Sequence, residues 1–310
     1  MTGKKKPIIT VYLLFIALIL SMYLPGLQKS IAAPTAMMIA CCIILLIISY
    51  GIFRGKKPRA AGDIGTIIFA LLLFWQFYTT RLGLGHLILV PTPEAVFNVF
   101  FVERRLMLAG IGSSLSLLLI GFAIALPLGT VAGLFTGWSK RLAGMFVPIA
   151  RVLSPVPAII YAPYLIAIMP SFRSASGAVL VLGIFWPTFL QTVSRVNGFE
   201  KALADSARLL NLRWYEMLFG ILLPYVLPST LSGIRITLSM AFMLLVLAEM
   251  MGAHSGLGYF IKNFADYANY TNVIAGILLV AIVITLLNKL LDILYRHVLG
   301  KYETNGGVND

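Results

Sequence analysis

Eight apolar segments, each long enough to cross a lipid bilayer, constrain the fold of this chain more than any other feature. A transmembrane helix needs about 20 predominantly apolar residues, and open sheet edges are not tolerated in hydrocarbon. With 60% hydrophobic and 11% charged residues, the chain also differs from soluble domains, which carry about 25% charged residues. The predicted fold class is an all-α integral membrane protein with transmembrane helices at about 8–27, 31–53, 64–80, 106–135, 145–169, 175–194, 226–251 and 272–295.

The positions of the basic residues predict the orientation of these helices. Cytoplasmic loops of membrane proteins are enriched in Lys and Arg. An N-terminus in the cytoplasm places most of the 24 basic residues on that side, including those of 54–59 and 195–224. Both termini are therefore expected in the cytoplasm, in a multi-pass protein of the cell inner membrane. The net charge of +13 is explained by this orientation, so no nucleic-acid partner is predicted.

The first apolar segment has two readings, a secretory signal or a retained anchor. Its apolar run exceeds the 7–15 residues that are usual for a signal, and 31–33 make a poor cleavage site. A retained anchor is the prediction.

No metal site or catalytic site is predicted. Cys41 and Cys42 are adjacent, and His86, His254 and His297 are scattered, so neither set has the spacing of metal ligands. The sequence also lacks the phosphate-binding pattern G-x-x-x-x-G-K-[ST] and the hydrolase patterns H-E-x-x-H and G-x-S-x-G. The chain is expected not to be an enzyme and to bind no cofactor itself.

A charged segment interrupted by a turn lies between the sixth and seventh predicted spans. Residues 204–210 predict one short helix, 214–218 predict the start of a second, and Asn211 tolerates the left-handed conformation that the turn requires. Two short helices at an angle can insert into a groove on a soluble partner, and the alternative is a helix pair lying on lipid headgroups. The candidate coupling residues are Asp205, Ser206, Ala207, Asn211, Ile221, Leu223 and Pro224.

This segment resembles the cytoplasmic loop of ABC importer permease subunits, which follows E-A-A-x3-G-x9-I-x-L-P and contacts the ATPase subunit. The spacing is the same here, while Asp205, Ser206 and Asn211 replace Glu, Ala and Gly. Over about 64–295 the chain is identified as a member of the type I ABC importer permeases, in the nitrate, sulfonate and taurine branch. The resemblance implies a six-helix permease core, preceded here by two extra N-terminal helices.

A basic linker divides the predicted helices into two groups. Residues 54–59 separate the first two spans from the remaining six. The expected organisation is a two-helix membrane extension with its linker at 1–60, a permease core at 61–298 containing the coupling loop, and a cytoplasmic tail at 299–310.

Prolines interrupt the predicted fifth span within residues 154–164. Each proline, including Pro155 and Pro157, removes a backbone donor, so the helix must be broken or kinked. Lipid would penalise the freed carbonyls, so this segment is expected to face protein or a water-filled path where Tyr161 and Tyr164 meet solute. The alternative is a purely structural kink.

The seventh span carries two charged residues, Arg235 and Glu249. A charge in mid-membrane costs about 2.5–3.5 kcal/mol on insertion scales, so both side chains should face the bundle or lie near its ends. At 1.5 Å per residue they are about 21 Å apart along the helix, which excludes a direct pair. Arg235 is predicted to attract an anionic solute or hold a gate, or to be satisfied by backbone carbonyls. Glu249 is predicted to lie in the solute pathway or to accept hydrogen bonds beneath the outer loop.

These features and the resemblance predict a permease subunit of an ATP-driven ABC importer, with a pathway for a small anionic solute of the nitrate, sulfonate or taurine kind. The resemblance implies ATPase subunits that bind ATP and Mg, an extracytoplasmic solute-binding protein and a second permease copy. The alternative is an ion-coupled secondary transporter. Such transporters normally use several intramembrane carboxylates, and Glu249 is the one carboxylate expected inside a span.

Overall fold

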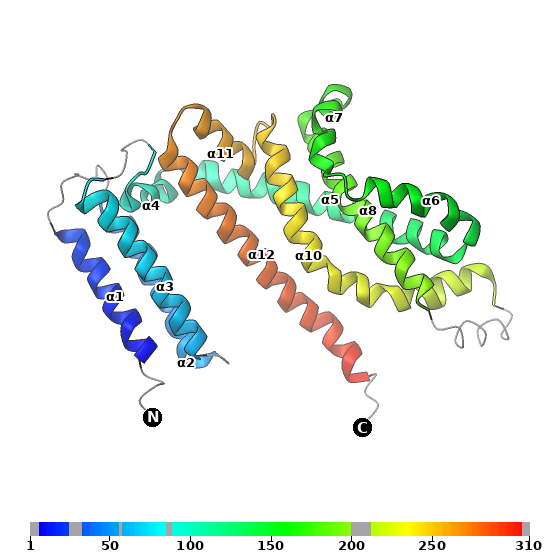
Figure 1. Ribbon diagram of the computed structural model, residues 1–310, viewed down its shortest axis with the longest axis horizontal. Helices are drawn as coiled ribbons and strands as arrows, with labels where there is room; N and C mark the ends of the chain where they lie inside the picture. Colours follow the sequence, from blue (N-terminus) through cyan, green and yellow to red (C-terminus); the bar gives the residue numbers. More distant parts are fainter. Residues whose placement is uncertain (1–5, 25–32, 56–57, 85–88, 200–211, 306–310) are drawn as a thin grey trace. The chain divides into compact units, whose positions relative to one another are not determined.

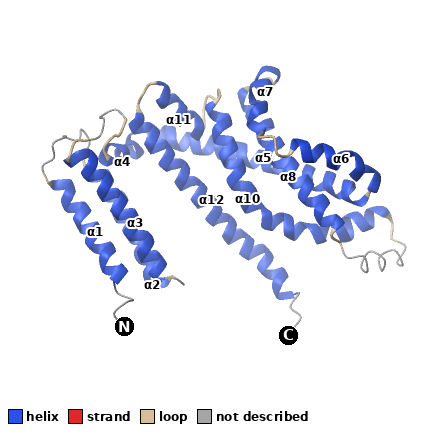
Figure 2. Cartoon of the chain, viewed as in Figure 1, coloured by secondary structure: helices blue, strands red, loops and turns tan. Residues whose placement is uncertain are grey.

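The computed structural model describes residues 6–24, 33–55, 58–84, 89–199 and 212–305. Within these ranges every regular element is helical, as Figure 2 shows, which confirms the predicted all-α class. The chain divides into two compact units, one formed by 1–108 with 260–278 and the other by 109–259 with 279–310.

The first unit is built on α3, which packs against both α1 and α2. Figure 1 shows α1 and α3 side by side, and α2 also contacts α4. Phe69 is fully buried in the apolar core of this unit, and its ring meets Phe15 edge to face at a centroid distance of 5.6 Å. The elements are α1 (Lys6–Tyr23), α2 (Thr35–Arg54), α3 (Pro58–Gln76), the π-helix η2 (Phe77–Arg81) and α4 (Pro93–Val102).

The second unit is organised around α8 (Phe172–Asn197), which contacts α6, the 3-10 helix η3, α7 and α10. Helix α5 lies close against α8, because Gly129 and Gly133 face Thr188 and Thr192. Helices α5, α11 and α12 each contain residues of both units. The remaining elements are α5 (Arg104–Trp138), α6 (Lys140–Leu153), η3 (Ala158–Tyr161), α7 (Ala162–Ile168), the π-helix η4 (Glu216–Leu222), α10 (Leu223–Met250), α11 (Leu257–Asp266) and α12 (Tyr270–Asn305).

The described part of the chain contains six helices long and apolar enough to cross a membrane, so the predicted count of eight spans is not confirmed. The first predicted span, where α1 lies, is not among these six. The fifth differs because its helix is broken, and counting the broken pair as one span raises the number to seven. The helices are nevertheless those of a multi-pass membrane protein.

Candidate functional site

The prolines of residues 154–164 break the predicted fifth span, as expected. Helix α6 ends at Leu153 and α7 begins at Ala162, and the two helical parts meet at 85°. Ala158 and Ala162 are buried against α8 and α10, so small side chains allow the break to pack on the rest of the unit. Tyr164 is 69% exposed. A role for the prolines and tyrosines in a solute path stays a prediction.

Glu249 is the best-defined polar residue of the candidate site, with a side chain that is only 2% exposed. Its Oε1 accepts a hydrogen bond from Ser114 Oγ of α5 at 2.7 Å, and its Oε2 accepts one from the Gly258 N–H at 2.8 Å. Ser114 Oγ also accepts a hydrogen bond from the Leu257 N–H at 2.9 Å. Because Leu257 and Gly258 begin α11, the carboxylate lies at a helix N-terminus, where free N–H groups and the helix dipole favour negative charge.

The geometry around this carboxylate matches one of the two roles predicted for Glu249. It is a hydrogen-bond acceptor that ties the turn between α10 and α11 to α5. Contact of Glu249 with solute stays a prediction.

Two glycines let the backbone approach Glu249 closely. Gly256 has a φ of +135°, which L side chains rarely adopt, and a Cβ there would collide with the Glu249 carboxyl group. A Cβ on Gly258 would collide with the carbonyl oxygen of Val246. The glycines that follow Glu249 in the sequence are therefore required by the packing around it.

Arg235 lies on the same helix as Glu249 and pairs with a different residue. Its Nη1 is 3.1 Å from Oδ1 of Asp292 on α12, with the two side chains 63% and 39% exposed. A carboxylate, not backbone carbonyls, is thus its partner. This corrects the expectation that Glu249 is the one carboxylate in a span, since Asp63 lies in the span Pro58–Arg81 and Asp292 lies in the span Tyr270–Leu294. Asp292 could have been found from the sequence, because it is an acidic residue inside an apolar segment.

The predicted coupling loop falls partly outside the described residues. Asp205, Ser206, Ala207 and Asn211 lie there, as does the whole helix predicted at 204–210. The second predicted helix is confirmed, because the chain is helical from Trp214 and continues into η4.

The end of that loop leads directly into α10. Pro224 lies in the first turn of this helix, directly after the π-helix η4. Ile221 and Leu223 pack against a buried apolar cluster that includes Leu218 and Leu222. The base of the loop is thus anchored in the second unit, and its contact with an ATPase stays a prediction.

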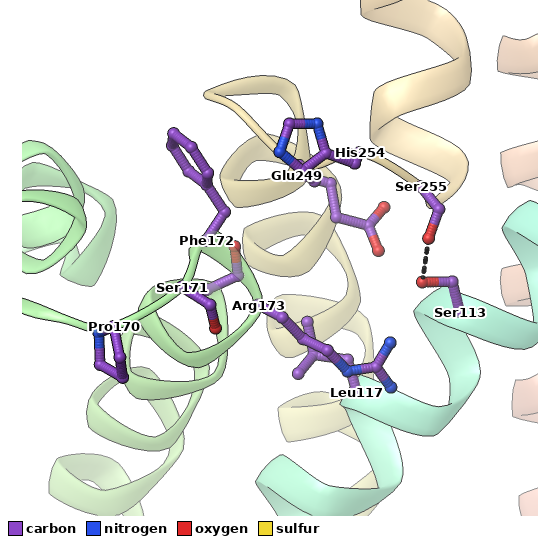
Figure 3. A pocket seen from close by; sticks show the side chains of 11 residues that line it. Ser113, Leu117, Pro170, Ser171, Phe172, Arg173, Glu249, His254 and Ser255 are labelled. Atoms are coloured by element: carbon purple, nitrogen blue, oxygen red, sulfur yellow. Dashed lines mark hydrogen bonds between the residues drawn. The ribbon is translucent and has the colours of Figure 1, made fainter.

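A cavity of about 430 Å³ opens beside Glu249 within the second unit. Figure 3 shows its side chains converging from α5, from the start of α8 and from the turn after α10. In addition to Glu249, its polar lining residues are Ser113, Ser171, Arg173, Ser176, His254 and Ser255.

Two hydrogen bonds organise the edge of this cavity. Arg173 Nη2 donates to Ser116 Oγ of α5 at 2.7 Å, and Ser255 Oγ donates to Ser113 Oγ at 2.7 Å. Arg173 lies in the first turn of α8. Its neighbours on α5 and after α10 are far away in the chain, so no local pattern revealed the cluster.

Within the ranges that the structure describes, no group of three or more His, Cys, Asp or Glu residues is placed to hold a metal ion.

The long apolar helices and the broken helix pair define a class of protein, a multi-pass helical membrane protein. Residues 125–303 match the family described as binding-protein-dependent transport system inner membrane component, and the chain belongs to this family. The predicted family is thereby confirmed, together with the function of a transport permease subunit.

Curated relatives match most of the chain. It is 31% identical to the putative aliphatic sulfonates transport permease protein of Bacillus subtilis, over 79% of this chain and 90% of the relative. Identity is 27% to the taurine transport system permease protein of Escherichia coli, over 76% and 88% of the two chains. It is 26% to the nitrate import permease protein of Synechocystis sp., over 78% and 90%. The nitrate, sulfonate and taurine branch is thus confirmed.

A solved structure supports the fold. The chain resembles one from the MetNI methionine ABC transporter in an inward-facing conformation, with a TM-score of 0.51 and 19% identity, over 65% of this chain and 98% of that chain. At this identity the similarity shows the fold alone.

Proposed function

We propose that this protein is the permease subunit of an ATP-driven importer for a small anionic solute, with an aliphatic sulfonate as the first candidate. The observation that carries the proposal is the 31% identity, over 79% of the chain, to the aliphatic sulfonates permease of Bacillus subtilis. The names of two further relatives specify taurine and nitrate. All three solutes carry a compact oxoanion group, which makes taurine and nitrate the second candidates.

The energy for transport comes from partners in this proposal. ATPase subunits bind ATP and Mg, a solute-binding protein delivers the solute from outside, and a second permease copy completes the path. The family description, which names binding-protein-dependent transport, supports this assembly. Transport then proceeds by alternating access, in which ATP binding to the partners shifts the population of outward-open and inward-open states.

We further propose that both termini are cytoplasmic in the inner membrane, with α1 and the α6–α7 pair completing eight crossings. The excess of Lys and Arg in the loops assigned to the cytoplasm supports this orientation. It places residues 195–224 on the side of the ATPase and the Arg173 cavity on the outer side. Residues 1–60 form the N-terminal extension, 61–298 the permease core and 299–310 the tail.

Reconstituted transport tests the proposal. The chain is co-purified with the ATPase and the binding protein encoded beside it, placed in proteoliposomes, and assayed for uptake of ethanesulfonate, taurine and nitrate. Uptake is expected only with binding protein outside and ATP on the ATPase side, and a hydrolysis-deficient ATPase is the control. Ion-driven uptake by this chain alone would contradict the proposal and favour a secondary transporter.

A further inference from the structure

We propose that the cavity beside Glu249 is an anion-binding site of this subunit, which takes a small oxoanion through the Arg173 guanidinium. A volume of about 430 Å³ lies within the range of small-molecule sites, about 300–1,000 Å³. The inference deepens the proposed function, on which it rests for the outer location of the cavity. It adds a place within this chain where the solute is held before it crosses.

Arg173 provides the positive charge of the site. Its side chain is exposed and lines the cavity, and its hydrogen bond to Ser116 uses one of the five N–H donors of a guanidinium. The ion pairs found among the described residues join Arg235 to Asp292 and Lys262 to Asp266, so neither consumes this charge. A planar guanidinium binds carboxylate and phosphate oxygens with two parallel hydrogen bonds, and a sulfonate or nitrate offers similar pairs of oxygens.

The N-terminus of α8 adds a second favourable contribution at the same place. Ser171 caps this 26-residue helix, with Ser174 N–H donating to Ser171 Oγ at 3.2 Å. Phe172 and Arg173 belong to the first turn, whose N–H groups lack intrahelical acceptors, and both line the cavity. The positive end of the helix dipole therefore lies beside the guanidinium.

Glu249 also lines the cavity, where the charge of Arg173 acts on its carboxyl group without the two side chains forming an ion pair, and the carboxyl group has hydrogen-bond donors of its own. Its two carboxylate oxygens accept hydrogen bonds from Ser114 Oγ and from Gly258 N–H at the start of α11. Ser113 and Ser255 lie on the same side of the cavity as the carboxylate. Because Ser255 Oγ donates its hydrogen to Ser113 Oγ at 2.7 Å, the Ser113 hydroxyl is the one of the two that keeps its O–H for a bound oxygen. The cavity thus combines one guanidinium, one helix N-terminus and several hydroxyls around a carboxylate that already has its own donors.

Protection of an introduced cysteine tests the site directly. Cys41→Ala and Cys42→Ala remove the native thiols, and Ala253→Cys places one thiol on the cavity wall. The permease–ATPase complex, in nanodiscs without ATP or binding protein, is treated with a membrane-impermeant maleimide in the presence of ethanesulfonate, nitrate or neutral acetamide. The two anions are expected to slow labelling saturably, and acetamide is expected to have no effect.

Variants of Arg173 then show whether its charge holds the anion. Arg173→Gln is expected to raise the anion concentration that gives half of the full protection by about tenfold or more. Arg173→Lys is expected to raise it less, because lysine keeps the charge and loses only the bidentate geometry of the guanidinium. Arg105→Gln, an exposed arginine that does not line the cavity, is the matched control and should leave protection unchanged. Melting temperature and yield of each complex show that the variants fold.

The labelling experiment tests the anion-binding site, and its outcome is separate from the test of the proposed transport function. Equal protection in the Arg173→Gln and unsubstituted complexes, equal protection by acetamide, or no protection by either anion would overturn the site. The proposed function is judged independently by ATP-dependent uptake in the complete complex. Uptake without charge-dependent protection leaves the function and removes the site, whereas charge-dependent protection without uptake leaves the site and removes the function.

Discussion

At the scale of single residues, Glu249 is placed to hold two segments of the chain together. Replacing it with Leu leaves Ser114 Oγ and the Gly258 N–H without their acceptor in a buried place, at a cost of about 1–3 kcal/mol for each unsatisfied group. Glu249→Leu is therefore expected to lower the melting temperature of the purified complex clearly, and Glu249→Gln less. Asp63→Asn, at an exposed acidic residue, is the control. A Glu249→Leu complex as stable as the control would contradict this role.

The ion pair between Arg235 and Asp292 predicts coupling between two helices. Each single change, Arg235→Gln or Asp292→Asn, leaves one charge unpaired in a span, while the double change leaves none. The partial exposure of both side chains keeps the effect below the full cost of a mid-membrane charge. In a double-mutant cycle, we expect the double variant to lose less thermal stability than the two single variants lose together. If the loss in the double variant equals that sum, the ion pair does not stabilise the bundle.

Arg235 also carries a prediction about transport. Arg235→Gln is expected to weaken uptake of an anionic solute in the reconstituted complex, because the guanidinium is 63% exposed and can still attract an anion beside its ion pair with Asp292. The half-saturating solute concentration is measured beside that of Arg141→Gln, an arginine of α6. Unchanged uptake would remove Arg235 from the predicted solute path.

Residue-scale prediction from the sequence worked where partners are close in the chain and failed where they are distant. The proximity of Glu249 to the glycine-rich turn follows from a separation of nine residues to Gly258. Ser114 is 135 residues away and Arg235's partner lies on another helix, so no periodicity indicates either contact.

At the scale of elements, close packing of α5 on α8 depends on glycines one helical turn apart. A Cβ on Gly133 would lie 2.6 Å from Thr192 Cβ and 2.9 Å from the Phe189 carbonyl oxygen. Small residues at this spacing let membrane helices approach closely. Gly133→Leu is expected to destabilise the protein by about 1–3 kcal/mol or more through overpacking. Gly112→Leu, on the same helix with nothing within 4 Å, is the matched control for thermal unfolding.

The apolar segments and the prolines determined how well the elements were predicted. Long apolar runs located α2, α5, α8, α10 and α12, because a span has a strong compositional signature. The prolines located the break after Leu153, since each removes a donor. The 85° angle at the break depends on packing against α8 and α10, which composition does not encode. The π-helices η2 and η4 have no compositional pattern and were not predicted.

At the scale of the whole molecule, the sequence indicated membrane insertion and family, and the grouping of helices came from the structure. The basic linker suggested a boundary near residue 60, which stays a prediction. The structure groups α3 with α1 and α2 in one unit, where Gly65 lies against Ile48 and Val11. Contacts of this kind join helices that are separate in sequence, so a change in local composition does not locate them.

Coupling to an ATPase is a property of the assembled molecule and yields the last prediction. In the complete complex, Asn211→Val is expected to reduce solute-stimulated ATP hydrolysis severalfold while membrane insertion stays unchanged. A β-branched residue resists the left-handed conformation predicted for the turn between the two short helices. Asn211→Gly, which restores the residue of the family pattern, should preserve stimulation, and Asp205→Lys should impair it by reversing a charge. Both positions lie outside the described residues, so the ATPase activity of the reconstituted complex is the decisive measurement. If solute stimulates ATP hydrolysis equally in the Asn211→Val and unsubstituted complexes, the coupling role of this loop is refuted.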